Sequence, residues 1–226
     1  QVLLIPKRAL KEGYQIGYDN DIRKGMSGGP ILNRYGQLIG INGIHAHPLW
    51  GNPYVYEDGS SPTAARRDLM SRYSWGIPIQ TATSLASKGD STKAQVPISK
   101  LPPIANEVNN IAEKITVRID VPNSPECSGS GVIIAKKQNT YTVLTAEHVI
   151  REEVKCDRRV LSLVTHDGRK YPIQVNDNSV KTVPGSDLAV LEFTSNQTYD
   201  VATLADYQLS KNEEIIFISG WTGSKN

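Results

Sequence analysis

The sequence has 226 residues, enough for one large all-β domain or two small ones that bury a core without help from a metal. Its 25 Lys and Arg side chains against 23 Asp and Glu give a net charge of +2, which argues against a nucleic acid or an anionic membrane as partner. No apolar run approaches the ~20 residues that a membrane-spanning helix needs, so we expect no membrane span.

Residues 1–85 alternate short apolar runs with turn signals, which is typical of a β-sheet protein. The expected strands are Val2–Ile5, Tyr14–Tyr18, Gly29–Leu32, Gln37–Ile44 and Ser74–Gln80. Residues 33–36 are expected to form the turn of a hairpin. Residues 45–73 contain three prolines and are interpreted as a surface insertion.

The stretch 86–105 is interpreted as a linker, because Lys, Ser, Asp, Gly and Pro replace apolar residues there. After a short helix at 106–114, strands are expected at Ile115–Val121, Ser130–Ala135, Thr140–Thr145, Val160–Thr165, Lys170–Val175, Leu188–Phe193 and Glu213–Gly220. Many short strands joined by turns predict an all-β barrel or sandwich. The sequence contains no Gly-rich phosphate loop and no metal-ligand spacing, so we expect no cofactor and no metal.

The most distinctive segment is residues 23–30, which read RKGMSGGP and precede an apolar strand. Gly25 allows the backbone to turn so that the amides of Gly25 and Ser27 converge on one point, as in an oxyanion hole. Gly28 and Gly29 keep side chains away from a substrate and permit backbone conformations closed to other residues. Taken alone, the segment also fits a glycine-rich turn between strands.

Two further residues have the contexts expected for partners of Ser27. His148 ends an apolar strand in the motif TAEHV, and Asp187 begins another in the motif SDLAVL. In a Ser-His-Asp triad the histidine takes the serine proton, while the aspartate orients the histidine and stabilises its positive charge. Each context has an ordinary structural explanation on its own, but their combination with the serine loop is hard to attribute to chance.

These three motifs resemble those of the chymotrypsin/trypsin-like serine peptidases, in a bacterial trypsin-like branch. The resemblance implies two six-stranded Greek-key barrels with a triad of Ser27, His148 and Asp187 in the cleft between them. It implies peptide-bond hydrolysis through an acyl-enzyme, with a peptide or protein as substrate.

The same resemblance implies a disulfide between Cys127 and Cys156. Cys127 stands where the family often has a cysteine ahead of the histidine strand. The usual partner directly follows the histidine, but Val149 occupies that position here, and Cys156 a few residues later takes its place. A disulfide favours an extracytoplasmic compartment, periplasmic or secreted, over the cytoplasm.

The order of the motifs is a cyclic rotation of the family's order. The family runs His, Asp, Ser, whereas this chain runs Ser27, His148, Asp187. The expected units follow the same rotation: 1–85 as most of the C-terminal-type barrel, 86–105 as the linker, 106–210 as the N-terminal-type barrel, and 211–226 as the first strand of a C-terminal-type barrel. The chain is therefore either a circular permutant or a window cut from tandem domains. In the second case the barrel halves meet within one chain or by exchange in a homodimer.

The substrate pocket has its own candidates. Asp21 lies six residues before Ser27, where trypsin carries the aspartate at the base of its primary pocket. If Asp21 is buried there, it favours Arg or Lys before the scissile bond; otherwise it belongs to a polar turn. Asn42, Gly43 and Ile44 are expected to line the pocket wall and to offer strand-type hydrogen bonds to a peptide.

The sequence thus predicts a trypsin-like serine endopeptidase. The main alternative is a catalytically silent peptidase-fold scaffold, or a binding module, whose triad does not assemble in this chain. A carbohydrate-binding or adhesion β-protein is a weaker alternative, because it leaves the three motifs unexplained.

Overall fold

The structure is a computed structural model, and it describes residues 2–46, 53–82, 105–122, 124–151, 156, 158–176, 179–205 and 215–222. The linker expected at 86–105 lies outside the described residues except for Ala105, where a helix begins.

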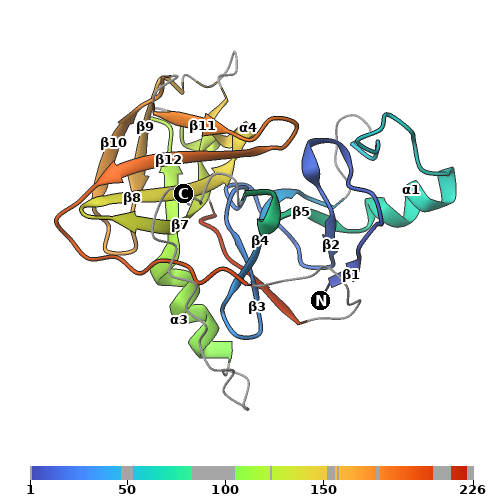
Figure 1. Ribbon diagram of the computed structural model, residues 1–226, viewed down its shortest axis with the longest axis horizontal. Helices are drawn as coiled ribbons and strands as arrows, with labels where there is room; N and C mark the ends of the chain where they lie inside the picture. The colour runs from blue at the N-terminus through green and yellow to red at the C-terminus, as the bar shows by residue number, and fades with distance from the viewer. Residues whose placement is uncertain are drawn as a thin grey trace.

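The first sheet is antiparallel and has six strands within the described ranges, in the order β1-β2-β5-β4-β3-β13 (Figure 1). Its strands are β1 (Val2–Leu4), β2 (Ile16–Tyr18), β3 (Pro30–Asn33), β4 (Leu38–Ile44), β5 (Ser74–Pro78) and β13 (Ile216–Ile218). The last strand comes from the far end of the chain, and its Ile218 pairs with Ile31 of β3. Residues 216–218 thus join the sheet that residues 2–78 begin.

The second sheet is also antiparallel and has the order β10-β9-β6-β7-β8-β12-β11. Its strands are β6 (Thr116–Asp120), β7 (Gly129–Lys137), β8 (Thr140–Ala146), β9 (Val160–Val164), β10 (Lys170–Gln174), β11 (Val180–Thr182) and β12 (Leu188–Thr194). The sheet curls, so that β10 and β12 contact each other although four strands separate them in the pairing order. Six strands were expected here; β11, a three-residue edge strand, is the addition.

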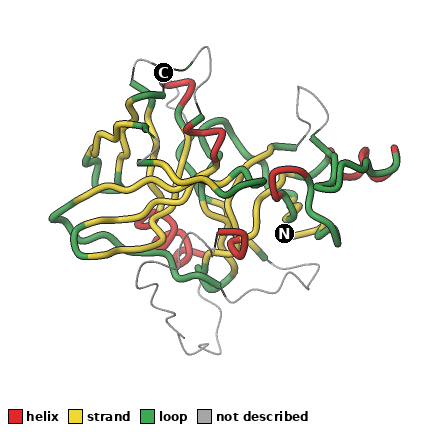
Figure 2. The backbone as a smooth tube through the Cα atoms, turned by 45° about the horizontal axis from the view of Figure 1, so that its top comes forward, coloured by secondary structure: helices red, strands yellow, loops and turns green. Residues whose placement is uncertain are grey.

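Helices are short and few among the described residues: α1 (Ala64–Ser71), α3 (Ala105–Ile115) and α4 (Glu147–Ile150), with the 3-10 turns η1 (Lys11–Gly13), η2 (Ile79–Ala82) and η3 (Pro125–Cys127). The α3 helix buries Val108, Ala112 and Ile115, whose i, i+4, i+7 spacing forms one apolar face. That face packs against β3 of the first sheet and β7 of the second. In Figure 2 the strands (yellow) occupy the middle of the molecule, and α1 lies at one end.

The two sheets share a hydrophobic core. One continuous cluster of buried side chains includes Leu32 and Ile77 from the first sheet with Val132 and Leu144 from the second. Because apolar burial joins the sheets directly, they pack as one body. The prediction of an all-β fold of the trypsin double-barrel type is confirmed as two curled antiparallel sheets. Among the described residues, no helix is long and apolar enough to cross a membrane.

Candidate active site

Ser27 lies in the loop between β2 and β3, and β7 of the other sheet holds this loop in place. The backbone N–H of Ser130 donates to the carbonyl oxygen of Ser27 at 2.8 Å. The Ser130 hydroxyl donates to the carbonyl oxygen of Gly25 at 2.7 Å and accepts from the backbone N–H of Trp221 at 2.9 Å. The serine loop is therefore fixed by a residue of the second sheet, which itself binds the segment after β13.

Close packing explains why glycines flank Ser27. Gly28 has φ +83°, and a Cβ there would lie 2.2 Å from both the Ser130 carbonyl oxygen and the Thr145 hydroxyl oxygen. A Cβ on Gly29 would lie 2.2 Å from the carbonyl oxygen of Ser219. Side chains at these positions would push the loop away from its neighbours, so glycine is required here by protein contacts as well as by any substrate.

The amides expected to form an oxyanion hole are available for that task. Gly25 has φ +94°, a conformation that favours glycine and turns the loop backbone. Within the described residues, the backbone N–H groups of Gly25 and Ser27 have no hydrogen-bond acceptor. Both residues line the cleft described below.

His148 and Asp187 come together because their strands are paired. β8 ends at Ala146, directly before the single turn of α4 that carries His148. Leu188 at the start of β12 pairs with Ala146, which places Asp187 beside that turn. One carboxylate oxygen of Asp187, Oδ1, accepts from the backbone N–H of His148 at 2.7 Å. The other, Oδ2, lies 2.6 Å from His148 Nδ1.

The electrostatics of this pair favour a charged carboxylate. Asp187 is 1% exposed, and burial would raise the pKa of its carboxyl. The hydrogen bonds and charge of His148, together with a hydrogen bond from the Tyr14 hydroxyl, outweigh burial and hold the pKa of Asp187 below its ordinary value. Because Nδ1 faces Asp187, the opposite ring nitrogen, Nε2, is left for other contacts.

Ser27 and His148 line the same cleft, which has a volume of about 420 Å³. The Ser27 hydroxyl donates to the carbonyl oxygen of Gly43 at 3.4 Å, and in the described part of the chain it makes no hydrogen bond with His148. Catalytic hydrogen bonds are often long or poorly aligned without substrate and tighten when it binds. The structure thus brings the serine and histidine into one cleft without joining them.

The expected pocket residues divide between the cleft and the protein interior. Gly43 lines the cleft, but neither Asn42 nor Ile44 does. Asn42 is fully buried: it accepts from the Tyr18 hydroxyl at 2.7 Å and donates to the carbonyl oxygen of Ser219 at 3.2 Å. Its amide therefore holds the first sheet together instead of facing a substrate.

Asp21 is not buried at the base of a pocket, as a residue that selects Arg or Lys would have to be. It is exposed, and it does not line the cleft. The cleft wall instead carries the basic residues Arg23, Lys24 and Arg158 against the acidic Glu126. The part of the structure that is described contains no group of three or more His, Cys, Asp or Glu side chains suited to a metal ion.

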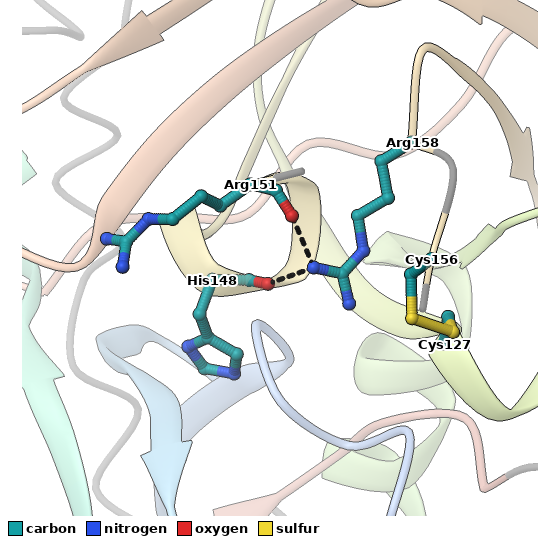
Figure 3. The surroundings of a disulfide bond; sticks show 5 residues. All are labelled: Cys127, His148, Arg151, Cys156 and Arg158. Carbon is teal, nitrogen blue, oxygen red and sulfur yellow. Dashed lines mark hydrogen bonds between the residues drawn. A yellow bond between two sulfur atoms is a disulfide. The ribbon is translucent and has the colours of Figure 1, made fainter. Parts of the chain in front are cut away.

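The disulfide between Cys127 and Cys156 is present, with 6.0 Å between the Cα atoms, which confirms its prediction. Arg158, two residues after Cys156, was not anticipated from the sequence. Its Nη1 donates to the carbonyl oxygens of His148 (2.8 Å) and Arg151 at the end of α4 (Figure 3). The ring of His148 points away from Arg158. A cation on the carbonyls at the end of a helix stabilises that end, so Arg158 stabilises the turn that carries His148.

Comparison with known proteins agrees with this architecture. Residues 129–226 match the family model of the trypsin-like peptidase domain. The matched region contains His148 and Asp187, whereas Ser27 lies outside it. The search of curated proteins found no match. The family match and the pair of curled antiparallel sheets together identify the chain as a protein of the trypsin-like peptidase fold.

Proposed function

We propose that the protein is a serine endopeptidase that uses Ser27, His148 and Asp187 as a catalytic triad. The observation that carries the proposal is the His148–Asp187 pair, in which Asp187 binds both the backbone N–H and Nδ1 of the histidine that shares a cleft with Ser27. The trypsin-like peptidase fold supports the same conclusion.

In the proposed mechanism the Ser27 hydroxyl turns from the Gly43 carbonyl toward Nε2 of His148. The Ser27 oxygen attacks the scissile carbonyl carbon while His148 takes the hydroxyl proton. The resulting oxyanion accepts hydrogen bonds from the backbone N–H groups of Gly25 and Ser27, which have no acceptor among the described residues. His148 then gives its proton to the leaving amine, and a water molecule, activated in the same way, hydrolyses the acyl-enzyme.

Asp187 has the role of orienting and stabilising His148. Its carboxylate keeps the Nδ1 proton on the side away from Ser27, so that Nε2 is the nitrogen that accepts the serine proton. The lowered pKa of Asp187 supports this role, because the carboxylate then stays charged throughout the pH range in which histidine acts as a base.

We propose, in addition, that residues 1–85 and 211–226 form one barrel unit and residues 106–210 the other, joined by a linker at 86–105. The pairing of β13 with β3 supports this division, because it places residues 216–218 in the same sheet as β1 to β5. It also supports assembly of the site within one chain, whether the chain arose by circular permutation or as a window from tandem domains. The disulfide supports an extracytoplasmic compartment.

The decisive experiment is labelling with a fluorophosphonate probe, which modifies activated serines. We expect the wild-type protein to be labelled at Ser27, and we expect Ser27→Ala and His148→Ala to abolish labelling. Circular dichroism of each variant serves as the control for folding. A folded wild-type protein without Ser27-dependent labelling would instead support the alternative, a peptidase fold that serves as a binding scaffold.

A further inference from the structure

Asp187 has a third donor that comes from the opposite sheet. The hydroxyl of Tyr14, at the entry to β2, donates to Asp187 Oδ2, the same oxygen that faces His148 Nδ1. Tyr14 is 2% exposed and does not line the cleft. Next to it, the backbone N–H of Asp187 donates to the carbonyl oxygen of Glu12 at 2.9 Å. The segment before β2 therefore holds Asp187 through its backbone and its carboxylate.

The space for Tyr14 exists only because residue 43 is a glycine. A Cβ on Gly43 would lie 2.3 Å from the Tyr14 hydroxyl oxygen and 2.2 Å from the ring carbon Cε1. Gly43 itself lines the cleft, and its carbonyl oxygen accepts from Ser27. The tyrosine ring thus lies directly behind the cleft wall, between that wall and the buried carboxylate.

We propose that Tyr14 is a positioning residue for the triad: its hydroxyl fixes the plane of the Asp187 carboxylate so that both oxygens face His148. This inference rests on the proposed function. Without Tyr14, the carboxylate would keep its two bonds to His148, but its Oδ2 would lose the donor that comes from the first sheet. The first sheet would then hold Asp187 only through its backbone, by the Glu12 carbonyl, and the direction of the carboxylate would depend on His148 alone.

The Tyr14 hydroxyl stays protonated, so it can donate its hydrogen bond to Asp187 at all times. Burial raises its pKa well above 10.0, and the negative charge of Asp187 raises it further. The hydroxyl therefore keeps its proton at every pH at which a histidine base operates. A donor that never titrates adds orientation without adding a pH dependence of its own.

The first test is Tyr14→Phe, which removes the hydroxyl and keeps the ring against Gly43. We expect the second-order rate constant for fluorophosphonate labelling of Ser27 to fall by about 10-fold to 100-fold, as expected when reacting groups are displaced. We also expect the acid limb of its pH profile to move to higher pH, because a carboxylate with one donor fewer attracts the imidazolium more strongly.

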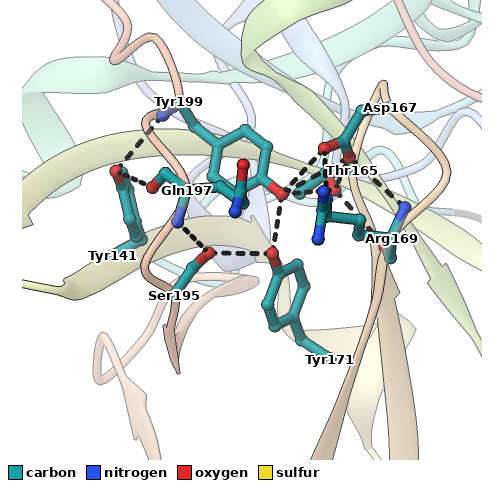
Figure 4. A network of polar contacts seen from close by, with 8 residues as sticks. All are labelled: Tyr141, Thr165, Asp167, Arg169, Tyr171, Ser195, Gln197 and Tyr199. Atoms are coloured by element: carbon teal, nitrogen blue, oxygen red, sulfur yellow. Dashed lines mark hydrogen bonds and ion pairs between the residues drawn. The ribbon is translucent and has the colours of Figure 1, made fainter.

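Tyr199→Phe is the matched control. Tyr199 is also a buried tyrosine whose hydroxyl donates to a carboxylate, that of Asp167, at 3.2 Å (Figure 4). Neither Tyr199 nor Asp167 lines the cleft that holds Ser27 and His148. Loss of the Tyr199 hydroxyl is expected to lower stability about as much as loss of the Tyr14 hydroxyl, while leaving the labelling rate of Ser27 and its pH profile unchanged. Equal profiles for Tyr14→Phe and wild type would overturn the proposal.

A spectroscopic test does not depend on activity. In protein with labelled histidine, the proton on Nδ1 of His148 reports its hydrogen bond to Asp187. We expect Tyr14→Phe to shift this resonance, and Tyr199→Phe to leave it in place, also in a Ser27→Ala background. An unmoved resonance in Tyr14→Phe would refute a positioning role. If the wild type is not labelled at Ser27, the proposed function fails while this measurement still decides the role of Tyr14.

A reciprocal pair of substitutions tests whether the hydroxyl is the group that matters. Tyr14→Ala removes the donor, and Gly43→Ser places a side chain where Tyr14 now lies. In the double variant the serine hydroxyl occupies the vacated space beside Asp187. We expect the double variant to be labelled faster than Tyr14→Ala alone. A double variant no faster than Tyr14→Ala would count against the hydroxyl as the positioning group.

Discussion

At the residue scale, Asp187 is the side chain that joins the two sheets at the proposed site. Its two oxygens take hydrogen bonds from the backbone and ring of His148 and from Tyr14, and its backbone binds Glu12. A buried carboxylate is stable only when its charge is met by such donors. The same hydrogen bonds that stabilise the negative charge of Asp187 also fix the orientation of its carboxylate.

The lowered pKa of Asp187 makes a prediction for acid stability. A carboxyl whose pKa is lower in the folded than in the unfolded protein stabilises the fold fully above its ordinary pKa, about 3.9. That stabilisation is lost as the pH falls through the lowered value. We expect the difference in free energy of unfolding between wild type and Asp187→Asn to shrink between pH 6 and pH 2. Chemical denaturation at several pH values measures it, and a difference that does not vary with pH would contradict the contacts described for this carboxylate.

The exposure of Asp21 makes a second prediction at this scale. Because Asp21 lies outside the cleft, we expect Asp21→Asn to leave the ratio of cleavage after Arg or Lys to cleavage after other residues unchanged. Lys24→Glu, which reverses a charge on the cleft wall, is expected to raise that ratio several-fold. Cleavage of a peptide library by the variants measures both effects. An altered profile for Asp21→Asn would support the interpretation of Asp21 as the base of a trypsin-like primary pocket.

Sequence motifs predicted the residues with local signatures and missed those without them. Ser27, His148 and Asp187 each stand in a short pattern of small and apolar residues, which can be recognised in isolation. Tyr14 has no such pattern, since its importance comes from Gly43, 29 positions away, and from Asp187 on the other sheet. Arg158 was missed for the same reason, because its partners are backbone carbonyls of α4.

At the element scale, the serine loop makes a prediction about packing. Gly28→Ala introduces a Cβ 2.2 Å from two atoms of the second sheet at a positive φ, so we expect it to lower the free energy of unfolding by about 2–5 kcal/mol and to reduce labelling of Ser27. Gly59→Ala is the control: it has a similar φ of +81° but no atom within 4 Å of the new Cβ. Its expected cost is about 1–2 kcal/mol from backbone strain alone.

Urea denaturation of the two alanine variants separates the packing cost from the conformational cost. If both variants lose the same stability, the close approach of the serine loop to β7 and β8 is not what requires a glycine.

Strands were predictable wherever their apolar runs were long, and the exceptions have physical reasons. β11 has three residues, of which Lys181 and Thr182 are exposed, so it leaves almost no apolar pattern. α1 lies within the stretch 45–73, where prolines and turn residues dominate the composition. The side of the sheet that Asn42 faces was not predictable, because the register between β4 and β5 shifts between Asn42 and Ile44. Such a shift exchanges the faces to which side chains point.

At the scale of the whole molecule, the fold predicts a site that assembles within one chain. β13 pairs with β3 of the same chain, and Trp221 binds Ser130 beside the serine loop. We therefore expect a monomer by light scattering. We also expect a mixture of Ser27→Ala and His148→Ala, unfolded and refolded together, to remain unlabelled. Exchange of barrel halves would pair the intact serine of one variant with the intact histidine of the other, so recovered labelling in that mixture would show assembly between chains.

The pairing of β13 with β3 also has a consequence for synthesis. The serine loop leaves the ribosome nearly two hundred residues before the strand and the segment that close against it, residues 216–221. His148 and Asp187 emerge in between. Contacts that span so much sequence form late and slowly. In the proposed enzyme, the nucleophile would therefore stay without its partners while the residues between them are made, and its loop would close only after residues 216–221 have followed.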